Sequence, residues 1–257
     1  MSFLIIALTA FVASILTFFS GFGLGTILLP VFAIFFPVDM AVALTGVVHL
    51  LNNLFKLTLV GRHAQREVVL RFGLPAIAGA LLGAWLLLRL SGIAPLYSYQ
   101  IGDRHFDITG IKLIIAVLMI FFAFMEILPS LQRWQLGKQY LTLGGLLSGF
   151  FGGLSGHQGA LRSVFLIKLG LPKEAFIATG VVIACLVDFS RLGVYFSRYV
   201  GQHLIDNAAL LMVAVGAAFA GAYLGNRMLK KVTLEFLQYL VAAAIVVLAL
   251  LMGAGIV

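Results

Sequence analysis

The chain has 257 residues, of which 62% are hydrophobic and only 10% are charged, and its formal net charge is +8. In soluble domains roughly a quarter of the residues are charged. The large share of apolar residues in this chain therefore excludes a water-soluble fold. Residues 1–38 and 236–257 contain no charged residue, and each run is long enough for a bilayer-spanning helix of roughly twenty residues. The composition predicts an all-α integral membrane protein that crosses the bilayer many times.

The positive charge lies mostly between the apolar runs, as at Arg62, Arg66 and Arg71. This pattern fits contacts with lipid headgroups and argues against a nucleic-acid partner. Residues 1–36 contain no basic residue, so we expect the N-terminus to be retained and not to act as a cleaved signal peptide. Cys185 is the single cysteine, which excludes an intramolecular disulfide, and we expect no metal site and no cofactor.

Taken in chain order, the apolar segments are expected at residues 2–36, 39–60, 72–90, 111–129, 139–171, 174–196, 206–226 and 233–257. The first and the fifth are too long for one straight helix, because a span needs roughly twenty residues. Both contain a glycine cluster, at residues 21–25 and 149–156. We therefore predict that both helices are broken inside the membrane.

The first glycine cluster contains Gly21, Gly23 and Gly25. A helix that breaks in hydrocarbon exposes backbone N–H and C=O groups, which is tolerated only where protein or a water-filled cavity covers them. The free N–H groups and partial positive charge of the next helix start suit an anion. We therefore include these three glycines in a candidate substrate site.

A polar stripe follows in the next segment, where His49, Asn52, Asn53 and Lys56 recur at helical spacing. Such a stripe in an apolar helix faces a cavity or another helix. Asn52 and Asn53 are candidate substrate ligands, or else they form an interhelical hydrogen bond. His49 and Lys56 are candidates for coupling or site support, although Lys56 also suits the membrane surface. Thr45, just before this stripe, is a further candidate ligand.

The second glycine cluster leads into the most polar stretch of the apolar segments. Ser155, His157, Gln158, Arg162 and Ser163 lie there among Gly, Ala, Leu and Phe residues. An arginine at the bilayer centre costs about 2.5–3.5 kcal/mol on insertion scales, so it needs a function or a partner. We predict that Arg162 is the cationic ligand of an anion at a half-helix start. The alternative is that it snorkels to an interface.

In the following segment Asp188 and Arg191 lie three residues apart, after the uncharged run 175–187. This spacing allows an ion pair on one helix face. The pair either neutralises itself to permit insertion or takes part in gating or proton coupling, and Asp188 is also a candidate partner for Arg162. Thr179, near the start of this segment, is a candidate substrate ligand.

Short sequence matches recur in the same order in the two halves of the chain. They predict two repeated transmembrane units, 1–130 and 139–257, within one transporter domain. Duplicated units with Gly-interrupted helices are typical of secondary transporters and indicate the binding site. Parallel and inverted arrangements both remain open, and breaks near the midplane favour the inverted one. The matching stretches are Ser20-Gly21 with Ser155-Gly156, Pro37 with Pro172, 45–48 with 179–182, and 79–83 with 221–225.

Not every glycine is assigned to the site. Gly79, Gly83, Gly221 and Gly225 are spaced four apart in otherwise regular segments. Small residues at this spacing are typical of close helix packing in membranes, so we predict a packing role for them.

The sequence shows no known catalytic centre. Ser155 and His157 are neighbours, but no acid partner stands at a defined spacing, and the stretch lacks the strand-to-helix setting of a nucleophile elbow. Residues 21–25 lack the preceding strand and closing lysine of a nucleotide-binding loop. We therefore do not expect an enzyme, although a membrane enzyme or a scaffold remains an alternative.

The chain resembles the TauE/SafE (sulfite exporter, TSUP) family of membrane anion transporters over about residues 5–255. The resemblance rests on the glycine-rich break followed by Pro30, and on the second break with its downstream Ala178-Thr179-Gly180. It implies a duplicated helical transporter of sulfite, organosulfonates or related small anions in the cell inner membrane. Family members commonly show a triple-glycine break, an apolar run and a proline in both halves, whereas residues 156–163 read GHQGALRS here. This departure fits a subgroup with a charged site in the second half.

The predicted function is therefore secondary transport, most simply export, of a small anion by alternating access. An uncoupled anion channel is the alternative transport mechanism. The expected partners are the small anionic substrate and the lipid bilayer, and a homodimer is an open alternative.

Overall fold

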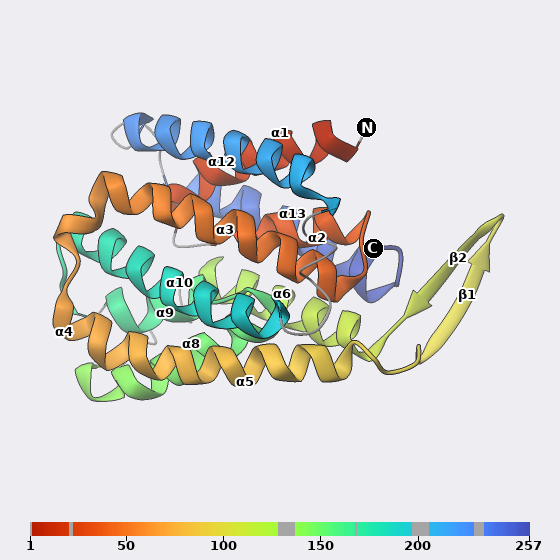
Figure 1. Cartoon of the computed structure of the whole chain (residues 1–257), viewed down its shortest axis with the longest axis horizontal. Coiled ribbons are helices and arrows are strands. Elements are labelled where there is room, and N and C mark those ends of the chain that lie inside the picture. The colour runs from red at the N-terminus through yellow and green to blue at the C-terminus, as the bar shows by residue number, and fades with distance from the viewer. Residues whose placement is uncertain (1, 21–22, 128–136, 168, 197–205, 229–233) are drawn as a thin grey trace.

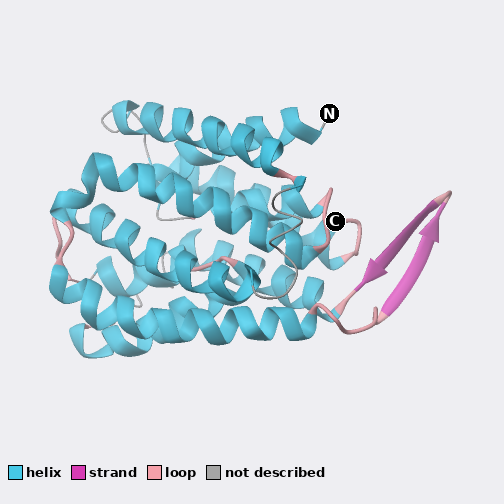
Figure 2. Cartoon of the chain, in the orientation of Figure 1, coloured by secondary structure: helices cyan, strands magenta, loops and turns pink. Residues whose placement is uncertain are grey.

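The structure, a computed structural model, describes residues 2–20, 23–127, 137–167, 169–196, 206–228 and 234–257. Within these ranges the chain is a bundle of helices from which a two-stranded hairpin projects at one end (Figures 1 and 2). The α-helices are α1 (Ser2–Ser20), α2 (Leu24–Ala33), α3 (Val38–Val60), α4 (Arg66–Val68), α5 (Leu74–Leu90), α6 (Gly110–Ile127), α8 (Leu141–Ser155), α9 (Gly159–Ile167), α10 (Lys173–Tyr195), α12 (Ala208–Met228) and α13 (Leu234–Gly253). Short 3₁₀ turns at Gly61–His63 and Lys138–Tyr140 and a π-helical turn at Val69–Gly73 connect or precede some of them.

The described helices include several that can cross a bilayer by length and composition: Val38–His63, Arg66–Leu90, Lys173–Tyr195 and Ala208–Arg227. Large apolar side chains point outward from the bundle, with Leu4 75% and Met212 70% exposed. In water these side chains would be uncovered, whereas in a bilayer they face lipid. The predicted all-α, multi-pass membrane fold is confirmed.

Both long apolar segments are broken where glycines occur. Helix α8 ends at Ser155, and Gly156 closes it in the left-handed region (φ +80°), which glycine adopts without strain. Helix α9 then begins at Gly159. In the first segment α1 ends at Ser20 and α2 begins at Leu24, while residues 21–22 lie outside the described part. The predicted helix breaks are confirmed, and their position within the membrane stays a prediction.

Helices α3 and α10 correspond closely. Each has 23 residues and begins after a proline, Pro37 or Pro172, with φ −52° and ψ 149°. Each also has an acidic side chain in its first turn, where it complements the helix dipole. The two helices run antiparallel, because Gly46 lies against Arg191 and His49 against Asp188. This orientation is what inverted repeats require, and the duplication itself stays a prediction.

Helices α5 and α8 run parallel and touch backbone to backbone. A Cβ atom added to Gly149 would overlap the carbonyl oxygen of Ala76, and one added to Gly79 would overlap that of Leu146. Gly221 of α12 meets the Phe11 carbonyl oxygen of α1 in the same way. The predicted packing role is confirmed for Gly79, Gly83 and Gly221. Glycines thus allow two helix pairs, α5–α8 and α1–α12, to approach at backbone distance.

The hairpin joins β1 (Tyr97–Ile101) to antiparallel β2 (Arg104–Ile108). Its turn contains Gly102 at φ +61°. Tyr99 stacks on Phe106, and the Tyr99 hydroxyl donates to the Ala254 carbonyl oxygen at 2.6 Å. This hairpin was not predicted, and it ties the end of the first half of the chain to residues near the C-terminus.

We predict that Gly149→Ala lowers the melting temperature of the purified protein, because the new methyl group must displace backbone of α5. Overpacking of this kind costs about 1–3 kcal/mol. Gly216→Ala in α12 is the matched control, since nothing lies within 4 Å of its added Cβ. Thermal unfolding of both variants in detergent measures the difference. Equal melting temperatures for the two variants would contradict the packing assignment.

Candidate functional site

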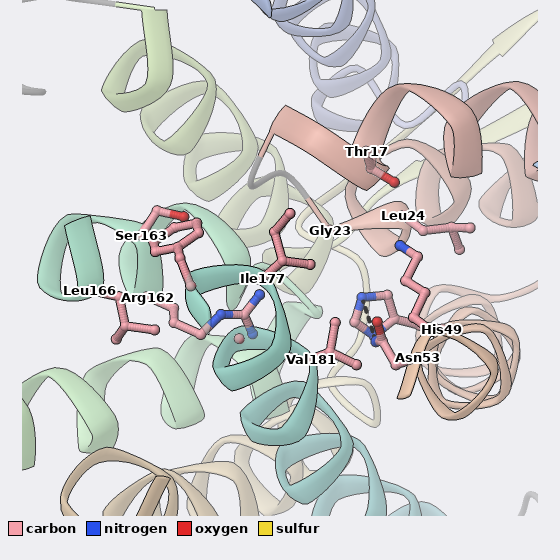
Figure 3. Close-up of a pocket in the computed structure, with 13 residues that line it drawn as sticks. Thr17, Gly23, Leu24, His49, Asn53, Arg162, Ser163, Leu166, Ile177 and Val181 are labelled. Carbon is pink, nitrogen blue, oxygen red and sulfur yellow. Dashed lines mark hydrogen bonds between the residues drawn. The ribbon is translucent and has the colours of Figure 1, made fainter. Parts of the chain in front are cut away.

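A pocket of about 60 Å³, here called the polar pocket, opens between α1, α2, α3, α9 and α10. One water needs roughly 10–15 Å³ by this measure, so the pocket has room for several waters or one small anion. Figure 3 shows Arg162 entering it from the α9 side, with His49 and Asn53 on the α3 side. Its lining residues are Thr17, Gly23, Leu24, His49, Asn53, Lys56, Arg162, Ser163, Leu166, Phe176, Ile177, Gly180 and Val181.

The polar pocket is positively charged. Lys56 and Arg162 line it, and its described lining contains no aspartate or glutamate. Lys56 is only 6% exposed, so its side chain is part of the pocket wall and does not lie free at a membrane surface. A concave site with cationic groups and low-dielectric walls concentrates anions. The pocket is therefore suited to a small anion.

Arg162 lies in the first turn of α9, at the half-helix start where the sequence placed it. Its Nη1 donates to Gln158 Oε1 at 3.4 Å. The guanidinium lies against Gly180 of α10, where an added Cβ would be 3.3 Å from Arg162 Nε. Arg162 thus has its place in the pocket because α10 carries no side chain at residue 180.

Asp188 is the junction of a buried polar network and is fully buried. Its Oδ1 accepts from Arg191 Nε at 2.9 Å and from Gln158 Nε2 at 3.1 Å. Its Oδ2 lies 2.6 Å from His49 Nδ1. The predicted ion pair with Arg191 is confirmed, and among the described residues Gln158 joins Asp188 to Arg162 by hydrogen bonds. The network joins α3, α10 and the second helix break.

Arg191 is also fully buried, and it is held from several sides. Its Nη1 donates to the Gly152 carbonyl oxygen of α8 at 3.3 Å. Its guanidinium lies against Gly46, where an added Cβ would be 3.3 Å from Arg191 Cζ. Gly46 and Gly180 follow the matching threonines of the two halves, so each half provides a glycine that accommodates one guanidinium. The Arg191 guanidinium beside Gly46 is neutralised by Asp188, and the Arg162 guanidinium beside Gly180 faces the polar pocket.

The polar stripe of α3 divides between two roles. His49 and Asn53 line the polar pocket. Asn52 is fully buried and accepts a hydrogen bond from the Ser14 hydroxyl of α1 at 3.3 Å. Asn52 therefore forms the interhelical hydrogen bond that the sequence left as an alternative, while Asn53 faces the pocket.

Other predicted site residues lie outside the pocket lining. The His157 Nδ1 lies 3.0 Å from the Ser155 hydroxyl, and its ring stacks on Phe122. The Thr179 hydroxyl accepts from the backbone N–H of Gln65 at 2.9 Å. Gly25 and Thr45 pack against each other, and Gly21 lies outside the described residues. Of the predicted residues, those that the pocket brings together are Gly23, His49, Asn53, Lys56, Arg162 and Ser163.

Sequence reasoning missed Thr17 and the apolar wall of the pocket. Thr17 donates to the Ala13 carbonyl oxygen at 2.7 Å, a local bond that suits any helix. The apolar wall includes Leu24, Phe176 and Ile177, which look like every other apolar residue of the chain. Their only signal is that they flank the breaks or the repeated proline.

A family model described as "Sulfite exporter TauE/SafE" matches residues 6–252. The chain belongs to the sulfite exporter TauE/SafE family. This match confirms the resemblance seen in the sequence and supports a multi-pass membrane transporter over an enzyme. No curated protein and no solved structure matches the chain.

We predict that Asp188→Asn strongly destabilises the protein, because it leaves the buried Arg191 charge without its carboxylate. Breaking one partner of a buried ion pair costs about 3–5 kcal/mol. The double variant Asp188→Asn, Arg191→Gln should recover part of this loss, because it removes both charges. Thermal unfolding of the single and double variants measures the coupling. If Asp188→Asn melted like the unmodified protein, the network would not stabilise the fold.

Proposed function

We propose that the chain is a secondary transporter that exports a small anion, such as sulfite or an organosulfonate, across the cell inner membrane. The observation that carries this proposal is the meeting of Lys56 and Arg162 in one small pocket beside two broken helices. Charged side chains within a membrane bundle are rare and mark substrate pathways. A protein that served only as a scaffold would not need two cationic side chains around a pocket.

In this proposal Arg162 and Lys56 bind the charged oxygens of the anion. Guanidinium groups form strong, directional hydrogen bonds with oxyanions, and an ammonium adds a point charge. Helix α2 begins at Leu24 beside the pocket, after the N-cap residue Gly23. The positive end of the dipole of this helix favours the same anion.

The apolar wall of the polar pocket determines which uncharged face or group the substrate can carry. Leu24, Phe176 and Ile177 offer no hydrogen bonds, so they suit the lone-pair face of sulfite or the short alkyl group of an organosulfonate. The volume of about 60 Å³ limits the substrate to a small ion. A long-chain sulfonate would need the pocket to widen.

Alternating access is supported by the two kinds of helix contact. The α5–α8 and α1–α12 pairs are packed through glycines at backbone distance, which favours each pair moving as a unit. The antiparallel α3 and α10 meet instead through the side chains of His49, Asp188 and Arg191. In the proposed cycle the glycine-packed pairs rock about this polar contact and expose the pocket to each side in turn. A homodimer stays an open alternative.

We predict that Arg162→Gln reduces anion affinity by about 10–100-fold, because a hydrogen bond to a charged group is worth roughly 1.5–3 kcal/mol. Arg162→Lys should retain more affinity, because it keeps the charge. Flux into proteoliposomes should be measured for sulfite, sulfate, short organosulfonates and carboxylates.

The control is Arg71→Gln, which removes an exposed arginine outside the pocket and should leave flux unchanged. Full binding and flux in folded Arg162→Gln would contradict the proposed site. Flux that rises linearly with anion concentration, without saturation or counterflow, would favour an uncoupled channel.

A further inference from the structure

His49 stands between the polar pocket and the buried ion pair. Its Nδ1 lies 2.6 Å from Asp188 Oδ2, and its ring lines the pocket with Lys56 and Arg162. The residue is only 5% exposed. A change of charge on this ring would therefore act directly on whatever occupies the pocket.

The contacts of His49 assign its two ring nitrogens to different tasks. A carboxylate only accepts hydrogen bonds, so the proton of Nδ1 donates to Asp188, and Nε2 is the atom that gains or loses a proton. Nε2 faces the start of α2, where an added Cβ on Gly23 would lie 3.3 Å away. Asn53 Nδ2 lies 3.1 Å from Nδ1 and 3.3 Å from Nε2. Because Nδ1 already carries the proton given to Asp188, Nε2 is the ring nitrogen that can accept from this amide in the neutral ring. A half-turn of that amide would offer its oxygen to a protonated Nε2.

The charged side chains near His49 come from α3, α9 and α10. Asp188 and Arg191 of α10 form an ion pair beside Nδ1, while Lys56 of α3 and Arg162 of α9 face the pocket. The described lining from α1 and α2 is uncharged. A proton on Nε2 would add positive charge beside Lys56 and Arg162 in the pocket, and a bound anion would offset that repulsion. Anion and proton therefore favour each other's binding, and the effect is reciprocal.

We propose that His49 is the proton-carrying residue of this transporter, so that the anion occupies the polar pocket together with a proton on His49 Nε2. This inference rests on the proposed function. The proton passes from water to Nε2 as the anion binds, and it returns to water when the anion leaves. Because one proton accompanies each anion, a dianion moves with one net negative charge, and the cycle responds to the proton gradient.

Calorimetric titration of the purified protein in detergent counts these protons. The probe is methanesulfonate, with sulfate as a second probe, because neither changes its charge near neutral pH, whereas sulfite does. Repeating the titration in buffers of different ionisation enthalpy gives the number of protons taken up per anion. We expect net uptake approaching one proton in the unmodified protein, and affinity that falls by up to tenfold per pH unit as the pH rises.

His49→Gln should bind with no proton uptake and with affinity that does not depend on pH, and His49→Asn tests the same loss in a second side chain. The matched control is His157→Gln. His157 is also buried, and it does not line the polar pocket, so its removal should leave the proton count intact.

Anion binding without proton uptake in the unmodified protein overturns the inference, whatever the stability of the variants, and leaves the proposed function standing. Proton uptake that persists in folded His49→Gln, or that disappears in His157→Gln, also overturns it. If the unmodified protein binds neither probe nor sulfite, the proposed function and the inference fail together.

Discussion

The rest of the site depends on the ion pair and hydrogen bonds that the buried Asp188 carboxylate makes. A fully buried charge is tolerated only when it is paired and hydrogen-bonded. Asp188 meets this condition through Arg191, His49 and Gln158. Each partner comes from a different place: α10 itself, α3 and the second helix break. Neutralising one carboxylate therefore brings three parts of the bundle together and positions the residues that face the polar pocket.

The glycines provide the frame around this network. Along α5–α8 and α1–α12 they allow the helix backbones to touch. Lipid tails are as apolar as the side chains, so close van der Waals packing of this kind helps to hold membrane helices together. At Gly46 and Gly180 they do something different, because each leaves the space that a guanidinium occupies. At Gly156 the left-handed backbone ends α8 and lets α9 start afresh, with Arg162 in its first turn. One residue type thus serves packing, cation placement and helix breaking.

Much of this arrangement can be predicted from the sequence, because the physical signals are strong. Uncharged runs predict membrane helices, and glycine clusters in overlong runs predict breaks. Arg162, Asp188 and Arg191 stand out because charge is expensive in lipid. The sequence does not show that Gln158 bridges Asp188 to Arg162, or that Asn52 bonds Ser14 while Asn53 faces the pocket. Those outcomes depend on helix rotation and register, which polar spacing along a single helix leaves open.

The sequence does not predict the hairpin or the apolar wall of the pocket, because their sequence signals are weak. Tyr97–Ile108 reads as a polar connection between two spans, and its strand pattern is only five residues long on each side. Phe176 and Ile177 become part of a site only because α10 packs against α3 and α9 around the pocket. Tertiary packing, and not residue type, gives such positions their role.

The most direct measurement of the central claim is an experimental structure of the protein with selenite, the heavier analogue of sulfite, located by the anomalous scattering of selenium. The account predicts a selenium peak in the polar pocket, with the oxyanion in contact with Arg162 and Lys56. A bound selenite elsewhere in the protein, with the polar pocket empty, would contradict it.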